Sequence, residues 1–237
     1  MLRHNLQLLF SYLLLPLSLV ACVTAAPVQK SSAPINRIAL VSLSVNNWAG
    51  MVSGTAGDAK ATALINGMLD GLLTSTEYKL ASIKRINRVD NFVGNANYRN
   101  MSVVSELKLM SPKVNGAAVA NFAQSEEEVI TARLAPETAK RLCSQLQVDA
   151  VVVVYSEWAS AQGSFVPTKR ALVKNVVSVW DRSGNQVFFK RVDEMGEGVL
   201  GGPYSPIVVN EGTIKQWGSA YLKSLDQILA EMKNTLS

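Results

Sequence analysis

Hydrophobic and polar positions along the first half of the chain predict a strand, a helix and a second strand. Residues 37–44 form a nearly continuous apolar run, which is typical of a strand buried on both faces of a sheet. Asp58 is a candidate cap for the helix that follows. That helix is predicted by one apolar stripe at three- and four-residue spacing, made of Ala61, Leu64, Ile65, Met68, Leu69 and Leu72. Residues 78–83 are expected to form the second strand.

The second half of the chain carries stronger patterns. Residues 136–146 are typical of a helix, and the valine-rich run 148–155 is typical of a buried strand. Residues 170–180 and 186–192 are rich in β-forming residues and are separated by Asp-Arg-Ser-Gly-Asn, which predicts a β-hairpin. A long helix is expected at 211–234, with a core-facing stripe of Ile214, Trp217, Tyr221, Leu225, Ile228, Leu229 and Met232.

The order of these elements predicts the fold class. A parallel first half and a meander at the end favour an α/β fold, with α+β as the alternative. We expect a mixed, mostly parallel sheet with a C-terminal β-hairpin and with helices packed on its faces. Residues 85–137 give only weak signals, apart from an acidic helix start at Glu126, Glu127 and Glu128.

The first 22 residues predict export from the cytoplasm. Arg3 and His4 form a basic start, and residues 8–20 are almost wholly apolar, as in a secretory signal peptide. A membrane-spanning helix needs about 20 apolar residues. Here the apolar run is shorter and contains Pro16.

Leu19-Val20-Ala21-Cys22 directly follows that apolar run and resembles the bacterial lipobox. The resemblance implies cleavage before Cys22, a diacylglycerol on its thiol and an acyl chain such as palmitate on its amino group. It divides the chain into a signal peptide (1–21), a lipidated cysteine with a tether (22–36) and a single periplasmic α/β domain (37–237). The alternative is an ordinary signal peptide with a chance cysteine. Val23 and Thr24 differ from the aspartate of inner-membrane retention, which favours the periplasmic face of the outer membrane.

Composition narrows the possible chemistry. The net charge of +5 is mild, and the basic residues form no concentrated stripe along the sequence. We therefore expect no nucleic-acid partner. The one histidine, His4, lies in the signal peptide, which excludes histidine-dependent triads and histidine-ligated zinc from the mature domain. We therefore expect no cofactor, no metal and no catalytic residues. Cys143 is left without a partner after lipidation, and we expect a buried thiol.

Two glycine-rich stretches resemble nucleotide-binding motifs only in part. Residues 196–201 match GxGxxG, but Gly202-Pro203 follows where a helix should begin, so a surface loop is the default interpretation. Residues 50–57 lack the Gly-Lys-Ser/Thr of a phosphate loop. Trp48, close to that stretch, is either the edge of a core or an exposed contact. Trp48 and Tyr204 are the candidate contacts for a partner.

Three further segments carry a resemblance to a known group. They are the strand Ile38-Ala39-Leu40-Val41-Ser42, the helix end and strand at 145–153, and Val-Trp-Asp-Arg-Ser-Gly at 179–184. This layout resembles the periplasmic lipoproteins that include the curli-secretion lipoprotein and the lipoprotein activators of penicillin-binding proteins. The resemblance implies a non-enzymatic binding, assembly or regulatory module that contacts a protein or cell-wall partner. The alternative is an envelope hydrolase that uses carboxylates without histidine.

Overall fold

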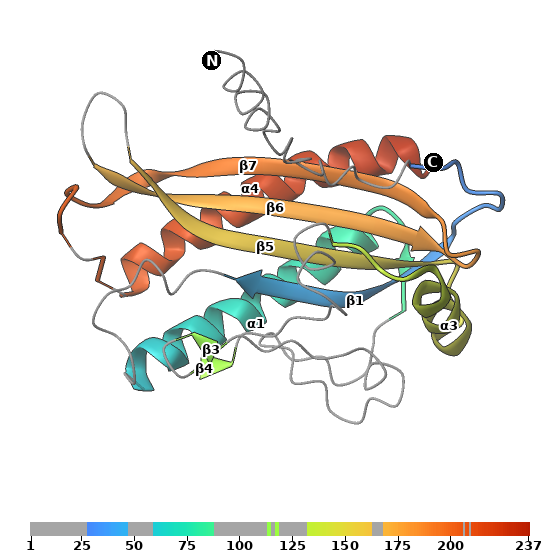
Figure 1. Cartoon of the computed structure of the whole chain (residues 1–237), viewed down its shortest axis with the longest axis horizontal. Helices are drawn as coiled ribbons and strands as arrows, with labels where there is room; N and C mark the ends of the chain where they lie inside the picture. The colour runs from blue at the N-terminus through green and yellow to red at the C-terminus, as the bar shows by residue number, and fades with distance from the viewer. Residues whose placement is uncertain are drawn as a thin grey trace, which may run out of the picture.

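The computed structural model of the chain describes residues 28–46, 59–87, 113–114, 117–118, 132–162, 168–205, 207–208 and 210–237 (Figure 1). The elements, in chain order, are β1 (Arg37–Asn46), α1 (Ala59–Ala81), β2 (Arg85–Ile86), β3 (Lys113–Val114), β4 (Ala117–Ala118), α3 (Pro136–Leu146), β5 (Ala150–Gln162), β6 (Lys169–Asp181), β7 (Gln186–Gly201) and α4 (Glu211–Thr235). Within this described part, no helix combines the length and apolar character that a membrane span requires.

The main sheet has five strands in the order β2-β1-β5-β6-β7. Strand β1 is parallel to β2 and β5, whereas β5, β6 and β7 are antiparallel neighbours. The α/β class with a mixed sheet is therefore confirmed, but the expectation of a mostly parallel sheet was wrong. The connections between β5, β6 and β7 are too short for parallel pairing, so these strands pair antiparallel. Strand β2, which is parallel to β1, has two residues and adds little parallel pairing.

The strand expected at 78–83 is also wrong, because its first four residues form the last turn of α1. Leu72, Thr76 and Leu80 are buried and recur at four-residue intervals, so this repeat keeps the segment helical against the core. The chain leaves the helix after Ala81 and reaches the sheet only at β2.

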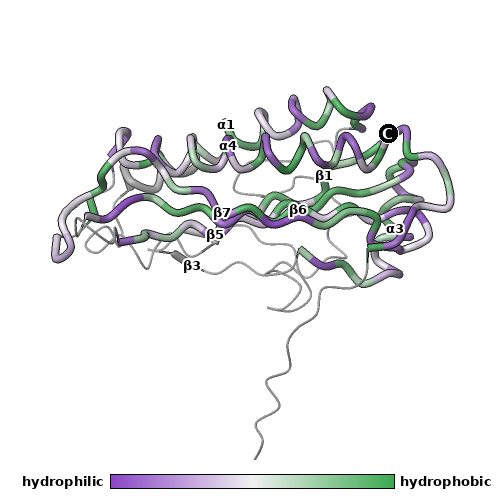
Figure 2. Tube along the Cα trace, turned by 90° about the horizontal axis from the view of Figure 1, so that it is seen from above, coloured by the Kyte–Doolittle hydropathy of each residue, from purple (hydrophilic) through white to green (hydrophobic). Residues whose placement is uncertain are grey.

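The sheet separates two apolar cores. Helices α1 and α4 lie together on one face of the sheet (Figure 2), where they cover Val152, Val154 and Trp158 of β5. Helix α3 packs on the other face, where its Leu142 joins Val151 of β5 in a second cluster. Neighbouring residues of β5 thus point into different cores, which explains the unbroken apolar run in its sequence.

Helix α4 begins with a capping box. Asn210 Oδ1 accepts the backbone N–H of Thr213, and the Thr213 hydroxyl oxygen accepts the backbone N–H of Asn210, both at 3.0 Å. The stripe predicted for this helix is confirmed, since all seven of its residues are buried.

A buried polar cluster joins α4 to α1 and β6. Tyr221 is fully buried, and its hydroxyl lies 2.8 Å from Thr76 Oγ1 in α1. Asn175 Nδ2 in β6 donates to the Tyr221 carbonyl at 3.0 Å and to Ser224 Oγ at 2.7 Å. These bonds connect polar groups that would be costly to bury alone, and they fix how the three elements pack.

Glycine is required in the turn between β6 and β7. Gly184 has a φ of 81°, and a Cβ atom there would lie 2.8 Å from the carbonyl oxygen of Pro136 in α3. Asp181 Oδ1 accepts the backbone N–H groups of Ser183 and Asn185, both at 2.9 Å. The turn therefore packs directly against the start of α3.

The GxGxxG stretch lies within β7, so its interpretation as a surface loop was wrong. A Cβ atom at Gly196 would lie 3.0 Å from Ala171 Cβ and 3.2 Å from the Gln216 carbonyl oxygen. The Gly198 N–H donates to Gln216 Oε1 at 2.8 Å. These glycines allow the first turns of α4 to approach the strand closely.

Cys143 on α3 is buried, as expected from the sequence. Burial raises the pKa of its thiol to about 12, and the nearby Asp181 carboxylate adds to the shift. A thiol with this pKa stays protonated at neutral pH and packs as a small apolar group.

Candidate functional site

Of the three residues singled out from the sequence, only Tyr204 belongs to the part of the chain that the structure describes. Cys22 and Trp48 lie outside it. Tyr204 is 98% exposed and lies in the connection between β7 and α4. A tyrosine this exposed contributes nothing to the core, so its placement is compatible with a role in contacts.

Other exposed apolar residues lie close to Tyr204 along the chain. The large apolar residues that are exposed in the described part are Val28, Tyr78, Met195, Val199, Tyr204 and Val208. Three of them, Val199, Tyr204 and Val208, belong to the end of β7 and the connection to α4, and we call them the distal surface. In Figure 1 this connection lies at the opposite end of the molecule from the C-terminus.

Hydrogen bonds hold the backbone of the distal surface in place. The Ser205 N–H donates to the Gly202 carbonyl at 3.3 Å, and Lys169 Nζ from β6 donates to the Ser205 carbonyl at 2.8 Å. The Thr213 hydroxyl donates to the Val208 carbonyl at 2.8 Å. Tyr204 and Val208 are thus presented on a connection tied to both β6 and α4, which reduces the entropy lost on binding.

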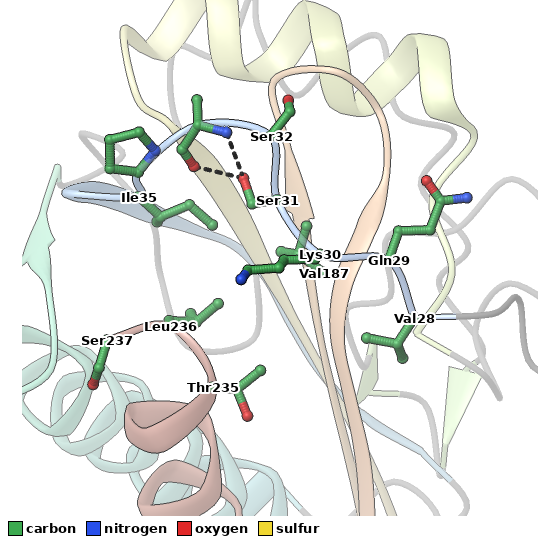
Figure 3. Close-up of a pocket in the computed structure, with 12 residues that line it drawn as sticks. Val28, Gln29, Lys30, Ser31, Ser32, Ile35, Val187, Thr235, Leu236 and Ser237 are labelled. Atoms are coloured by element: carbon green, nitrogen blue, oxygen red, sulfur yellow. Dashed lines mark hydrogen bonds between the residues drawn. The ribbon is translucent and has the colours of Figure 1, made fainter.

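A pocket of about 560 Å³ lies at the other end of the molecule. Its walls are residues 28–35, Val187 at the start of β7, and Thr235, Leu236 and Ser237. Figure 3 shows Lys30 extending into the space between Ile35 and Leu236. The lining thus combines apolar side chains with one amine and several hydroxyl groups.

The segment that forms the pocket is fastened to the domain. The Gln29 N–H donates to the Gln186 carbonyl at 2.9 Å, and Ile35 is 5% exposed within the main core. The sequence predicts a tether here, because residues 29–34 are small or polar. The apolar Ile35, two residues before β1, is the one signal in this segment that it docks on the domain.

Asp149 connects the start of β1 to the β6–β7 turn at this end of the sheet. Asp149 Oδ2 accepts the backbone N–H groups of Asn36 and Arg37, both at 2.9 Å, and Oδ1 pairs with the Arg182 guanidinium. Burial alone would raise the pKa of this carboxyl, but the hydrogen bonds from Arg37 and Asn36 and the charge of Arg182 outweigh it and lower the pKa. The ionised form of Asp149 therefore stabilises the junction of β1, β5 and the β6–β7 turn.

The variant Asp149→Asn is expected to lose about 1–3 kcal/mol of unfolding free energy at pH 7, because charge-assisted hydrogen bonds are lost. Since folding lowers the pKa, this stabilisation is complete above the unfolded value of about 4 and disappears as the pH falls through the folded value. Urea unfolding at pH 7 and at pH 3 should show the wild-type advantage shrinking.

The control for Asp149 is Asp226→Asn, which removes an exposed ion pair with Lys79 and should cost less than about 1 kcal/mol. Equal losses for the two variants at pH 7, or an Asp149 effect that does not change with pH, would contradict the role given to Asp149.

Comparisons with known proteins give only distant likenesses. No protein-family model matches the chain, and no curated protein matches it in sequence. Similar solved structures include the hypothetical protein CT253 from Chlamydia trachomatis, with 12% identity and a TM-score of 0.41 over 85% of this chain and 98% of that one. Another is the lipoprotein GNA1162 from Neisseria meningitidis, with 14% identity and a TM-score of 0.35 over 82% and 99%. Likenesses at this level carry no inference about family or function.

Proposed function

We propose that the chain is an exported bacterial lipoprotein whose domain acts by binding a partner in the cell envelope rather than by catalysis. The anchor is the lipid on Cys22, at the periplasmic face of the outer membrane. The signal-like residues 1–21 and the lipobox-like Leu19-Val20-Ala21-Cys22 support this assignment. The resemblance to the curli-secretion and penicillin-binding-protein activator lipoproteins remains a prediction.

The position of residues 28–36 gives the proposed anchor a geometric consequence. Because Gln29 is bonded to β7, only the few residues after Cys22 separate the lipid from the folded domain. At about 3.3–3.6 Å per extended residue, that stretch reaches about 20 Å. The pocket end would therefore stay close to the membrane, and the distal surface would be the end available to partners further away.

The exposure of the Tyr204 side chain is the main observation that supports the binding role. A 98% exposed aromatic side chain on a hydrogen-bonded turn, with Val199 and Val208 also exposed nearby in the chain, matches the usual chemistry of a protein interface. Aromatic side chains in such positions supply much of the binding free energy of an interface. The proposed partner is therefore a protein of the envelope with an apolar contact surface.

Site-specific photocrosslinking in intact cells tests this proposal. A photoreactive amino acid at position 204 is expected to yield a discrete adduct with an envelope protein, and Tyr204→Ala should weaken that complex about 10–100-fold. The matched control is the same amino acid at Tyr78, a 79% exposed tyrosine on α1.

Adducts that are the same at positions 204 and 78, or no adduct at 204, would contradict a binding role for the distal surface. With the photoreactive amino acid at Val208 instead, a complex that Tyr204→Ala does not weaken would contradict the role of Tyr204 itself.

A further inference from the structure

Within the described part of the chain, strand β7 is the long edge of the main sheet and has β6 as its one neighbouring strand (Figure 1). Alternate backbone N–H and C=O groups of an edge strand point outward and are available to another strand. In the described part of the chain, hydrogen bonds from outside the sheet reach the β7 backbone near its two ends. The Gln29 N–H binds the Gln186 carbonyl, and Gln216 Oε1 accepts the Gly198 N–H.

The middle of β7 reads Lys190-Arg191-Val192-Asp193-Glu194. Its charges are antisymmetric about Val192, with two positive residues on one side and two negative residues on the other. A strand of this pattern is complementary to a second copy of itself running in the opposite direction. From this charge pattern we infer that β7 pairs antiparallel with β7 of a second copy, across a two-fold axis at Val192.

In this register Lys190 lies opposite Glu194 of the second copy, and Arg191 lies opposite Asp193. Phe189 lies opposite Met195, whose side chain is 44% exposed. The two-fold axis makes each pair occur twice, as in an isologous interface. Opposite charges and apolar pairs directly across two strands stabilise their pairing.

The register also matches the two faces of the sheet. Lys190 and Glu194 point toward α4, where they pair with Glu231 at 2.7 Å and Lys223 at 2.6 Å. Arg191 and Asp193, which alternate with them along the strand, pair with each other at 2.8 Å. Residues two, four or six apart share a face, so each pair of the proposed interface joins side chains on the same side of the sheet.

Neighbouring registers lose this complementarity. A pairing centred on Asp193 sets two aspartates against each other, and one centred on Arg191 sets two arginines against each other. A shift by a single residue places side chains of opposite faces together. The charge pattern therefore selects the Val192 register. Charged residues can also protect an edge strand from pairing, and trapping of a covalent dimer would separate the two roles.

Disulfide trapping of the anchored full-length protein in cells tests the inference. Paired residues on antiparallel strands have Cα atoms about 4.5–5.5 Å apart, which lies within the range of a disulfide. Val192→Cys should therefore form a covalent dimer under mild oxidation, at least tenfold faster than Tyr78→Cys. The unchanged protein controls for Cys143, which is buried.

Charge variants in the Val192→Cys background test the register. Arg191→Glu places two like-charged pairs across the axis and should reduce trapping at least tenfold. Exchanging the two residues, as Arg191→Asp with Asp193→Arg, keeps the complementarity and should restore trapping. Thermal unfolding close to that of the unchanged protein would show that the Arg191→Glu domain remains folded.

Trapping no faster than at position 78 would overturn the inference, and so would trapping that is unaffected by Arg191→Glu. The first result would assign the charges to edge protection, and the second would show that they do not set the register. The inference does not depend on the partner proposed for the distal surface, since crosslinks at position 204 are scored separately.

Discussion

Replacing Trp217 by alanine is expected to lower the free energy of unfolding by about 3–5 kcal/mol, because it empties the space between α4 and the sheet. Trp217 is 3% exposed, and its ring stacks on that of Trp158 in β5, with centroids 6.4 Å apart and planes 5° apart. Its Nε1 donates to the Ala159 carbonyl at 2.9 Å. The variant loses apolar burial, an aromatic contact and a hydrogen bond in one change.

Urea unfolding followed by circular dichroism measures this loss. A domain with an ordinary total stability of about 5–15 kcal/mol would become marginal at 37 °C. The control is Tyr78→Ala, which removes an aromatic side chain that is 79% exposed and should change stability by less than about 0.5 kcal/mol. A Trp217→Ala loss below about 1 kcal/mol would show that α4 does not depend on this contact.

The periodicity of apolar residues identified the elements around Trp217 better than it identified their neighbours in space. The helix expected at 211–234 is observed as Glu211–Thr235, and the one expected at 136–146 has those bounds in α3. Strand β5 was predicted at 148–155 but is observed as Ala150–Gln162. The prediction ended too early because Glu157 and other polar residues interrupt the apolar pattern in the second half of the strand. The spacing of apolar residues indicates whether a segment is a helix or a strand, but not which strand lies beside it. The prediction of a mostly parallel sheet therefore overestimated the number of parallel strand pairs.

The error at 78–83 has a similar cause. Tyr78, Leu80 and Ile83 fit a short strand when they are considered alone. Leu80 extends the series of Leu72 and Thr76 at helical spacing, and all three are buried. A window of six residues is too short to distinguish the two periods.

The candidate site was only partly accessible from sequence. Tyr204 was singled out from the loop-like composition around it, and it is exposed, but its role as a partner contact stays a prediction. The pocket at residues 28–35 was not foreseen, because the small and polar residues of that segment gave no sign that it docks on β7. The role of Asp149 depends on backbone groups of residues 36 and 37, which lie far away in the sequence.

The variant Cys22→Ser is expected to have the largest effect on location. Each buried CH₂ group contributes about 0.8 kcal/mol to membrane binding, so two or three acyl chains hold a protein essentially permanently. Serine has no thiol to accept the diacylglycerol, and the variant should incorporate no lipid at this position. Cys143→Ser is the matched control, because its thiol is buried in α3 and has a pKa of about 12, far from the nucleophilic thiolate form.

Metabolic labelling with palmitate, followed by separation of inner and outer membranes, tests the lipid anchor most directly. The unchanged protein and Cys143→Ser should carry the label and remain in the outer-membrane fraction after a high-salt wash, whereas Cys22→Ser should lose both properties. An unlabelled wild-type protein that washes off membranes as readily as Cys22→Ser would contradict the account.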